Sequence, residues 1–216
     1  MDSISDKVKK IRVEYEDKPL NIEDLDTNPL EQFNVWFQIA IDAEVNEANA
    51  MAISTISEEG TPRSRYVLFK DIVNNKLVFY SDYGSSKGRE MENNPSISGL
   101  FFWPELHRQI RLEGVVSKTS DEISDNYFAS RPRGAQLSAI ASSQSTEIEG
   151  RETVEDRIKE LEIEFEGKDI PRPDNWGGYA IDISFWEFWQ GRRSRTHDRF
   201  IYVKNDNSWE ITRLSP

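Results

Sequence analysis

The sequence predicts an α+β protein whose antiparallel sheet closes into a barrel, and three observations lead to this fold class. Apolar residues recur at every second position from residue 50 onward, which is typical of half-buried strands. Segments with helical capping signals interrupt these strands. The 216 residues suit one compact domain with a sizeable core. Many short strands with interspersed helices therefore favour a closed sheet.

The N-terminal part predicts an arm and then a helix. Residues 1–20 are charged and weakly periodic, so we expect a mobile arm or a short surface helix, followed by a single domain over residues 21–216. Asn28 is an N-cap residue, Pro29 suits the first helical position, and Glu31 stands where a capping box needs it. We expect a core face that contains Leu30, Phe33, Phe37, Ala40 and Ile41.

The rest of the chain alternates between strand and helix signals, separated by turn residues. We expect strands at 51–56, 64–70, 76–81, 97–103, 108–116, 178–183, 185–190, 200–204 and 209–214. We expect helices at 86–93, 119–128, 136–141 and 153–165. The segment 171–174 is too short to separate domains, so we expect an ordered loop there.

Composition excludes several function classes. The chain has 27 Lys and Arg against 39 Asp and Glu, a net charge of −12, which argues against a general nucleic-acid binder. Cysteine is absent, so thiol nucleophiles and thiolate zinc sites are excluded, and the two histidines lie too far apart in sequence for common metal motifs. The longest apolar run is too short to cross a membrane. We therefore expect a cytoplasmic protein with no metal, nucleic-acid or membrane partner.

Basic residues nevertheless gather in places where an anion can bind. Residues 61–133 carry 11 basic and 9 acidic side chains, a local charge of +2. Ser85–Gly88 opens a predicted helix, where hydroxyls, free N–H groups and a lysine form either a phosphate seat or an ordinary cap. Arg65 and Lys70 fall on opposite faces of one regular strand, so each needs its own anion. Ser130–Arg133 places two arginines at a helix end, which is a weak signal because cations suit that position without a ligand.

The densest constellation lies near the C-terminus. Glu187–Gly191 and Arg195–Arg199 combine an aromatic plane, two arginines and a histidine, which suits a flat, phosphorylated heteroaromatic ligand. The alternative is that Trp189 packs in the core and His197 is a surface residue bonded to Asp198. Hydrolysis by a serine nucleophile is disfavoured, because no Gly-x-Ser-x-Gly motif occurs.

These motifs, read in order, carry a resemblance that runs from about residue 10 to the last residue. The matching segments are Arg65–Lys70, Phe79–Ser81, Ser85–Lys87, Asn93–Pro95, Arg108–Gln109, Tyr127–Arg133, Ser143–Ser145, Trp176–Gly178, Glu187–Gly191, Arg195–Arg199 and Arg213–Pro216. Together they resemble the pyridoxine (pyridoxamine) 5′-phosphate oxidase family. The resemblance implies a split β-barrel, a homodimer with FMN at the subunit interface, and oxidation of pyridoxamine or pyridoxine 5′-phosphate to pyridoxal 5′-phosphate, with O2 as acceptor and H2O2 as product.

The resemblance also implies roles for individual residues. Flavin contacts carry over to Arg65, Val67, Leu68, Lys70, Tyr80, Ser81, Ser86, Lys87, Gln109, Gln144, Ser145, Trp189 and Arg199. Substrate contacts carry over to Arg12, Tyr15, Lys70, Tyr127, Arg131, Ala135, Arg195 and His197, of which Arg195 and His197 are the expected catalytic pair. Flavin performs the two-electron chemistry in such an enzyme, so the protein needs neither a thiol nor a metal.

Two positions depart from the usual family pattern. Ser86 stands where the family commonly has arginine, so one cation that would face the FMN phosphate is lost. Ala135 stands where a serine is frequent, so a hydroxyl of the substrate-phosphate seat is lost. We therefore expect weaker binding of FMN or substrate.

Two alternatives stay open. A phenazine-biosynthesis flavin oxidase shares the fold and the C-terminal motif, but a tricyclic acid does not need the phosphate seat formed by Lys70, Tyr127 and Arg131. A non-catalytic flavin- or pyridoxal-phosphate-binding protein does not need both Arg195 and His197.

Overall fold

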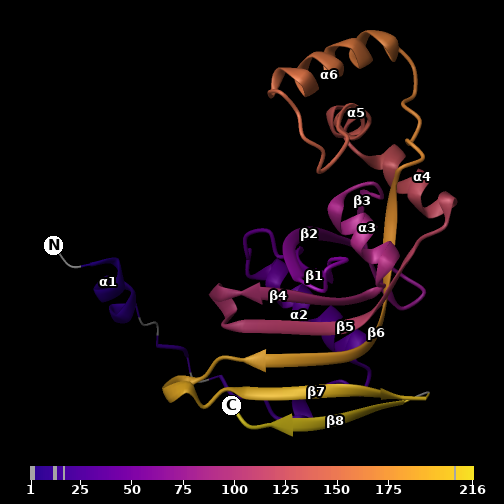
Figure 1. The fold of residues 1–216 in the computed structure, drawn as a ribbon. Helices are drawn as coiled ribbons and strands as arrows, with labels where there is room; N and C mark the ends of the chain where they lie inside the picture. The colour runs from indigo at the N-terminus through magenta and orange to yellow at the C-terminus, as the bar shows by residue number, and fades with distance from the viewer. Residues whose placement is uncertain (1–2, 12–13, 17, 207) are drawn as a thin grey trace. The chain divides into compact units, whose positions relative to one another are not determined.

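The structure is a computed structural model that describes residues 3–11, 14–16, 18–206 and 208–216 (Figure 1). Its strands are β1 (Ala50–Ile56), β2 (Pro62–Val73), β3 (Lys76–Asp82), β4 (Ser96–Trp103), β5 (Arg108–Lys118), β6 (Trp176–Gln190), β7 (Asp198–Asn205) and β8 (Ser208–Leu214). Its α-helices are α1 (Ile4–Lys10), α2 (Pro29–Asp42), α3 (Ser86–Asn93), α4 (Asp121–Ser130), α5 (Arg133–Ala141) and α6 (Glu152–Glu164). Short 3₁₀ turns lie at Ile22–Asp24, Pro104–Leu106 and Arg193–Arg195.

The strands form one antiparallel sheet that closes into a six-stranded barrel. The strand order is β3-β2-β1-β4-β5-β6, and a further pairing between β3 and β6 joins the two ends. Strands β7 and β8 extend the sheet from the C-terminal half of β6. A register shift between Phe69 and Asp71 marks a bulge in β2, the kind of irregularity that lets a sheet bend. The predicted barrel with flanking helices is confirmed.

The predicted elements are found, with two main differences. The segments expected at 178–183 and 185–190 form a single strand, β6, because Ser184 continues the extended backbone. Helix α2 begins at Pro29 as predicted, and Asn28 caps it by accepting a hydrogen bond from the Leu30 N–H at 3.0 Å. On that helix Trp36 is 2% exposed and Ile41 is 51% exposed, so the expectation that Ile41 lies in the core is wrong. The N-terminal segment does contain the short exposed helix α1.

Backbone packing divides the chain into two compact units. The first unit comprises residues 1–48, 100–112 and 184–216, and its core is largely aromatic. The Phe33 ring lies 5.3 Å from that of Phe101 and 5.5 Å from that of Trp186, and the Trp36 ring meets Phe188 edge-on at 5.2 Å. These offset and edge-on arrangements add to the free energy gained by burying the rings.

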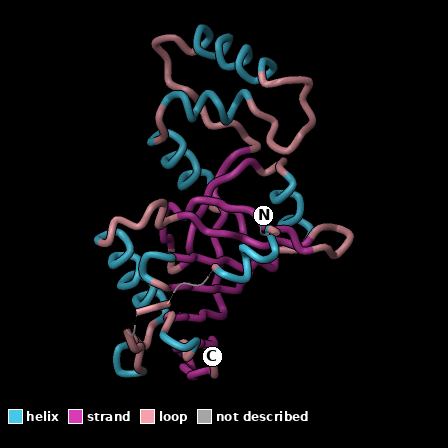
Figure 2. Tube along the Cα trace, turned by 90° about the vertical axis from the view of Figure 1, so that its left-hand side faces the viewer, coloured by secondary structure: helices cyan, strands magenta, loops and turns pink. Residues whose placement is uncertain are grey.

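The second unit comprises residues 49–99 and 113–183. It contains β1–β3 and, packed beside each other, helices α5 and α6 (Figure 2). A cluster of buried side chains in this unit consists of Phe128, Leu137, Leu161, Ile170 and Trp176. Among the described residues, no helix is both long and apolar enough to cross a membrane.

Candidate active site

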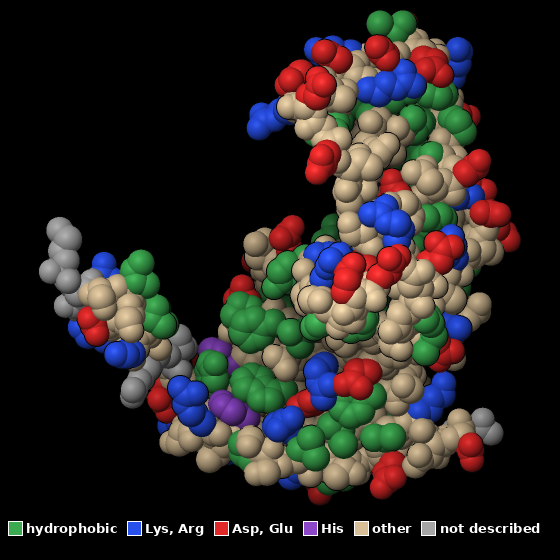
Figure 3. All heavy atoms as spheres, in the orientation of Figure 1, with side chains coloured by type: hydrophobic (Ala, Val, Ile, Leu, Met, Phe, Trp, Pro, Cys, Tyr) green, Lys and Arg blue, Asp and Glu red, His purple; other side chains and the backbone are tan. Residues whose placement is uncertain are grey.

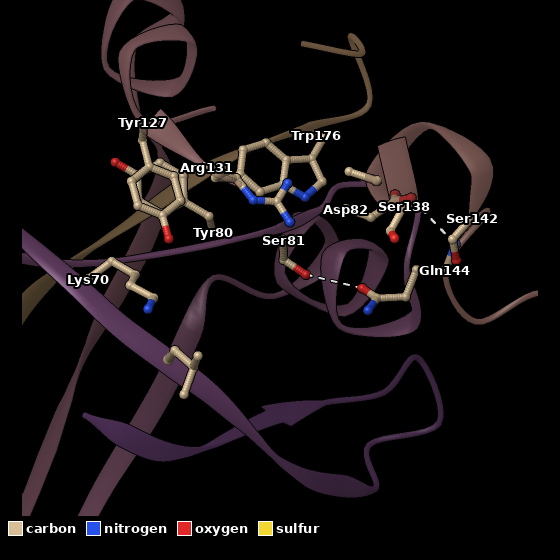
Figure 4. Close-up of a pocket in the computed structure, with 12 residues that line it drawn as sticks. Lys70, Tyr80, Ser81, Asp82, Tyr127, Arg131, Ser138, Ser142, Gln144 and Trp176 are labelled. Atoms are coloured by element: carbon tan, nitrogen blue, oxygen red, sulfur yellow. Dashed lines mark hydrogen bonds between the residues drawn. The ribbon is translucent and has the colours of Figure 1, made fainter. Parts of the chain in front are cut away.

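A cavity of about 410 Å³ lies in the second unit, beside the cluster around Trp176 (Figure 4). It is walled by aromatic rings and by two cations, Lys70 from β2 and Arg131 from the end of α4. Its lining residues are Leu68, Lys70, Tyr80, Ser81, Asp82, Tyr127, Arg131, Ser138, Ala139, Ser142, Gln144 and Trp176. A cavity that combines aromatic walls with polar and charged side chains suits a small aromatic molecule that carries a charged group.

Three aromatic rings of this cavity lie nearly parallel. Tyr80 and Tyr127 stack at 3.7 Å between ring centroids, and Trp176 lies 5.7 Å from Tyr80 at an interplanar angle of 11°. The pKa of Tyr80 is raised to about 12, chiefly by burial, so its hydroxyl stays protonated at neutral pH. Gly178 makes room for this ring, because a Cβ there would lie 2.9 Å from the Tyr80 ring and 2.5 Å from Thr119 Oγ1.

Arg131 carries an unsatisfied donor. Its guanidinium carbon lies 4.5 Å from the centre of the Trp176 ring, and its Nη1 is buried without a hydrogen-bond partner among the described residues. Burial lowers the pKa of Arg131, yet an arginine remains charged at neutral pH. A buried N–H group without an acceptor costs free energy, and an anionic ligand in the cavity removes that cost.

The local sequence holds Arg131 and Trp176 in place. The Arg131 backbone N–H caps α4 by donating to the Phe128 carbonyl at 3.2 Å. Arg172, with a side chain only 9% exposed, donates to the Trp176 carbonyl at 2.7 Å and pairs with Asp121 and Asp125 of α4. Arg172, in the segment 171–174 that was expected to be an ordered loop, therefore connects Trp176 to α4, whose C-cap is Arg131.

The second arginine of the Ser130–Arg133 motif has a different function. Arg133 donates to the carbonyls of Phe165 at 2.5 Å and Lys168 at 3.1 Å, just beyond the end of α6. Both carbonyls belong to the turn that follows α6. Arg133 therefore has a structural role, and Arg131 is the arginine of this motif that faces the cavity.

A second polar cluster surrounds the Lys87 ammonium, also within the second unit. Lys87 Nζ donates to Gln144 Oε1 at 2.7 Å, to Ser81 Oγ at 2.9 Å and to Ser85 Oγ at 3.1 Å. These acceptors are neutral oxygens, and no ion pair among the described residues involves Lys87. Burial and the nearby Arg65 lower the pKa of Lys87. A phosphate placed here would pair directly with this half-buried cation.

Arg65 lies in a neighbouring network that contains its own carboxylate. Its Nη2 donates to Glu90 Oε2 at 2.8 Å, and its Nη1 donates to the Thr55 hydroxyl. The Glu90 side chain is only 5% exposed. Burial alone would raise the pKa of Glu90, but hydrogen bonds from Thr55 and Arg65 outweigh it, so the pKa is lowered and Glu90 stays ionised.

The first unit holds the other candidate residues, where both histidines lie among basic and hydrophobic side chains (Figure 3). The His197 ring lies 4.6 Å from the Trp189 ring and 5.6 Å from Tyr15. Tyr15 in turn packs against His107 at 4.4 Å. Trp189 is half-buried, so the interpretation that it belongs to the core is wrong.

The tautomer of His197 follows from its hydrogen bond. Its Nδ1 accepts from the backbone N–H of Arg192 at 3.1 Å, so in the neutral ring the proton resides on Nε2. The alternative that His197 bonds to Asp198 is wrong. Burial and the charge of Arg195 lower the pKa of His197, so the ring is neutral at pH 7.

Arg195 lies in a turn of unusual backbone conformation. Its φ is +61° and that of Ser194 is +53°, so the turn between β6 and β7 is left-handed at two successive non-glycine residues. No carboxylate among the described residues lies within ion-pair distance of Arg195. Strained backbone of this kind is found preferentially at functional sites. Arg195 and His197 line a cavity of about 640 Å³.

Arg192, Arg199 and Arg213 pair with buried carboxylates. Glu187, with a side chain 4% exposed, pairs with Arg199 at 2.7 Å and with Arg111 at 2.8 Å. Asp198 pairs with Arg192 at 3.4 Å and Arg213 at 2.5 Å. These carboxylates explain how so many arginines crowd into one turn.

The structure thus places the predicted residues in two groups, each within one unit. The second unit contains Arg65, Val67, Leu68, Lys70, Tyr80, Ser81, Ser86, Lys87, Tyr127, Arg131, Ala135, Gln144 and Ser145. The first unit contains Tyr15, Gln109, Trp189, Arg195, His197 and Arg199. Arg12 lies outside the described residues. Ala135 is not among the residues that line the aromatic cavity, whose hydroxyls come from Ser81, Ser138 and Ser142 as well as the tyrosines.

Several residues of these groups were not predicted. Glu90 and Glu187 hold candidate ligand arginines, and Trp176 forms part of the aromatic wall. A signal for Glu187 was available, because it stands between apolar residues in a strand that is buried on both faces.

Two family models cover most of the chain. Residues 37–164 match the model described as pyridoxamine 5′-phosphate oxidase, and residues 176–216 match the pyridoxine 5′-phosphate oxidase C-terminal dimerisation region. A pyridoxine/pyridoxamine 5′-phosphate oxidase of Cyanothece sp. is 45% identical over 214 residues and covers 99% of both chains. One of Burkholderia mallei is 47% identical over 209 residues, which is 95% of this chain and 97% of that one.

Solved structures agree with this fold. PhzG from Burkholderia lata, in complex with tetrahydrophenazine-1-carboxylic acid, has a TM-score of 0.87 and 29% identity, and the match covers 94% of this chain and all of that chain. A pyridoxamine 5′-phosphate oxidase-related, FMN-binding protein from Nostoc punctiforme has a TM-score of 0.70 at 16% identity, which supports the fold alone.

Proposed function

The chain belongs to the pyridoxine (pyridoxamine) 5′-phosphate oxidase family, and we propose that it oxidises both phosphorylated B6 vitamers to pyridoxal 5′-phosphate with FMN as cofactor and O2 as acceptor, which releases H2O2. The chain is an enzyme of this family, with curated relatives matched over nearly its whole length. The observation that carries the substrate assignment is the buried, unpartnered Nη1 of Arg131 in an aromatic-walled cavity.

The substrate phosphate fits the cations of that cavity. Arg131 offers a buried donor, Lys70 offers a second positive charge, and Tyr127 offers a phenolic hydroxyl. Charged hydrogen bonds to phosphate are stronger than neutral ones, particularly where water is excluded. We assign Lys70, Tyr127 and Arg131 to the substrate phosphate.

The cofactor phosphate fits the Lys87 cluster. Among the described residues, the hydrogen-bond partners of Lys87 Nζ are the neutral oxygens of Ser81, Ser85 and Gln144, and Ser86 precedes it at the start of α3. When bound, FMN supplies the two-electron acceptor that this chain's own side chains lack. Trp189 and Gln109 are assigned to the flavin as well, and the ion pair with Glu187 holds Arg199 for the same role.

Arg195 and His197 would hold the substrate ring. We propose that the Arg195 guanidinium binds the ring hydroxyl oxygen and keeps it anionic, which places electron density in the ring where oxidation leaves positive charge. His197, as the neutral tautomer with a proton on Nε2, donates a hydrogen bond to the same face. The hydrogen bond from Arg192 N–H fixes the orientation of this imidazole.

The assembly is part of the proposal. Residues 176–216 match a dimerisation region, so the chain is expected to form a homodimer, and we propose that FMN lies at the subunit interface. A cytoplasmic location, expected from the sequence, stays a prediction.

A phenazine-type oxidase is the second candidate, because PhzG shares the fold at a TM-score of 0.87. The oxidases at 45–47% identity are closer in sequence than PhzG at 29%. The phosphate cations of the aromatic cavity also favour a phosphorylated substrate. A non-catalytic binding protein is disfavoured by the presence of both Arg195 and His197.

The proposal is tested with purified protein reconstituted with FMN. Pyridoxine 5′-phosphate and pyridoxamine 5′-phosphate should each give pyridoxal 5′-phosphate and H2O2 in equal amounts. Oxidation of a tetrahydrophenazine carboxylic acid but of neither vitamer would select the second candidate, and flavin binding without any turnover would select the non-catalytic one.

A further inference from the structure

Arg63 shares the buried carboxylate that holds Arg65. Arg63 and Arg65 are two residues apart on β2, so their side chains leave the same face of the strand. Arg63 Nη1 lies 3.0 Å from Glu90 Oε1, and Arg65 Nη2 lies 2.8 Å from Glu90 Oε2. Thr55 donates to Glu90 Oε2 at 2.5 Å. One carboxylate therefore fixes two guanidinium groups side by side.

Arg63 also faces the start of helix α3. Arg63 and Ser86 both line a cavity of about 190 Å³, together with Ser57, Glu58, Glu59, Arg89, Glu90 and Asn93. Ser86 is the first residue of α3, and Lys87 follows it. Arg63 and the residue at position 86 thus border the same cavity.

The charges of this network suit a phosphate monoester. Arg63, Arg65 and Lys87 carry three positive charges, and Glu90 and the Asp82 carboxylate near Lys87 carry two negative ones, which leaves a formal +1 to face the about −1.5 to −2 of a phosphate monoester at pH 7. Without Arg63 the same network has no net charge. Glu59 Oε2 lies 3.6 Å from Arg63 Nη2, but the Glu59 side chain is 71% exposed, so water and salt screen this ion pair.

Arg63 has donors left for a ligand. A guanidinium has five N–H donors, and the contacts to Glu90 and Glu59 engage one each on Nη1 and Nη2. Its side chain is 50% exposed, which leaves it accessible. We propose that Arg63 is a third cation of the flavin-phosphate site and supplies from β2 the charge that Ser86 does not supply from α3. This inference rests on the proposed function, because it assumes that FMN is the cofactor.

The test compares FMN with riboflavin, which lacks the phosphate. Apoprotein is titrated with each, and the dissociation constants are read from the quenching of flavin fluorescence. Arg63→Ala should raise the Kd for FMN by about 5- to 10-fold and leave the Kd for riboflavin unchanged. The expected effect is smaller than that of removing a fully buried charged contact, because Arg63 is half-exposed. Adding Ser86→Arg to Arg63→Ala should restore most of the lost FMN affinity.

Arg89→Ala is the matched control. Arg89 lines the same cavity and carries the same charge, but its guanidinium donates to the Gly84 carbonyl rather than to Glu90. Its removal should leave the ratio of the two dissociation constants unchanged. Should Arg63→Ala fail to fold, Arg63→Gln gives the same comparison, because it keeps part of the stem and two N–H donors.

An unchanged FMN Kd in the Arg63 variant, or an equal loss for FMN and riboflavin, overturns the inference. Either result leaves the proposed function standing as long as the unmodified protein binds FMN. Failure of the unmodified protein to bind FMN or riboflavin counts against the proposed function itself.

Discussion

Replacing Arg131 by glutamine should selectively weaken the use of phosphorylated substrates. The change removes a charge whose buried Nη1 has no protein partner, while the side chain keeps much of its length over Trp176. A charged hydrogen bond contributes about 1.5–3 kcal/mol, which corresponds to a loss of about 10- to 150-fold in kcat/KM. Because the group is buried, we expect the upper half of this range.

The assay measures kcat/KM for pyridoxine 5′-phosphate and for unphosphorylated pyridoxine in the FMN-loaded enzyme. Arg131→Gln should lower only the first value, so that the preference for the phosphorylated substrate collapses. Arg133→Gln is the matched control, because Arg133 belongs to the same motif but bonds the Phe165 and Lys168 carbonyls in the turn after α6. It should lower the melting temperature without changing the preference. Equal losses on both substrates in Arg131→Gln would refute the assignment of the phosphate to this cavity.

Three further predictions concern the first unit. Arg195→Leu should reduce kcat by at least about 100-fold and leave FMN content unchanged. Normal turnover in this variant would contradict the catalytic role assigned to Arg195. Burial and then Arg195 lower the pKa of His197, so kcat/KM should stay level as pH falls to 6.5 and decline only in more acidic buffer. In Arg195→Leu, where some activity remains, this decline should move to higher pH. An unmoved profile argues against an effect of the Arg195 charge on the pKa of His197. Glu187→Gln should cost about 2–3 kcal/mol of unfolding free energy at pH 7, because it leaves Arg111 and Arg199 without their carboxylate. Burial would raise the pKa of Glu187, but the hydrogen bonds from both arginines lower it, so this stabilisation is present above the ordinary pKa of about 4.3 and is lost as pH falls through the lowered value. Urea unfolding of both proteins at pH 7 and in stronger acid measures the difference, which should shrink in acid.

Local signals predicted most of the elements. Asn28 and Pro29 fixed the start of α2, and the stretch from Ser86 to Asn93 was predicted as a helix with its observed bounds. The period of two located every strand, although several extend one to three residues further, because pairing with a neighbour continues past the apolar pattern. The polar Ser184 was expected to separate two strands, yet β6 continues through it.

The charged partners in the site could not be predicted from the sequence. Glu90 lies in a helix with charged neighbours and reads as solvated, and only the tertiary structure places it beneath Arg63 and Arg65. The two arginines of the Ser130–Arg133 motif look equivalent in sequence, but one faces a cavity and the other bonds the turn after α6. Motif resemblance identified the cations, whereas burial and hydrogen bonding separated those available to a ligand from those already paired.

The most direct test of the account is the anaerobic addition of pyridoxamine 5′-phosphate to the FMN-loaded protein, followed by flavin absorbance. The account predicts that the yellow absorption bleaches with formation of one pyridoxal 5′-phosphate per flavin, and that it returns when O2 is admitted. A flavin that stays oxidised in the presence of both phosphorylated vitamers would contradict it.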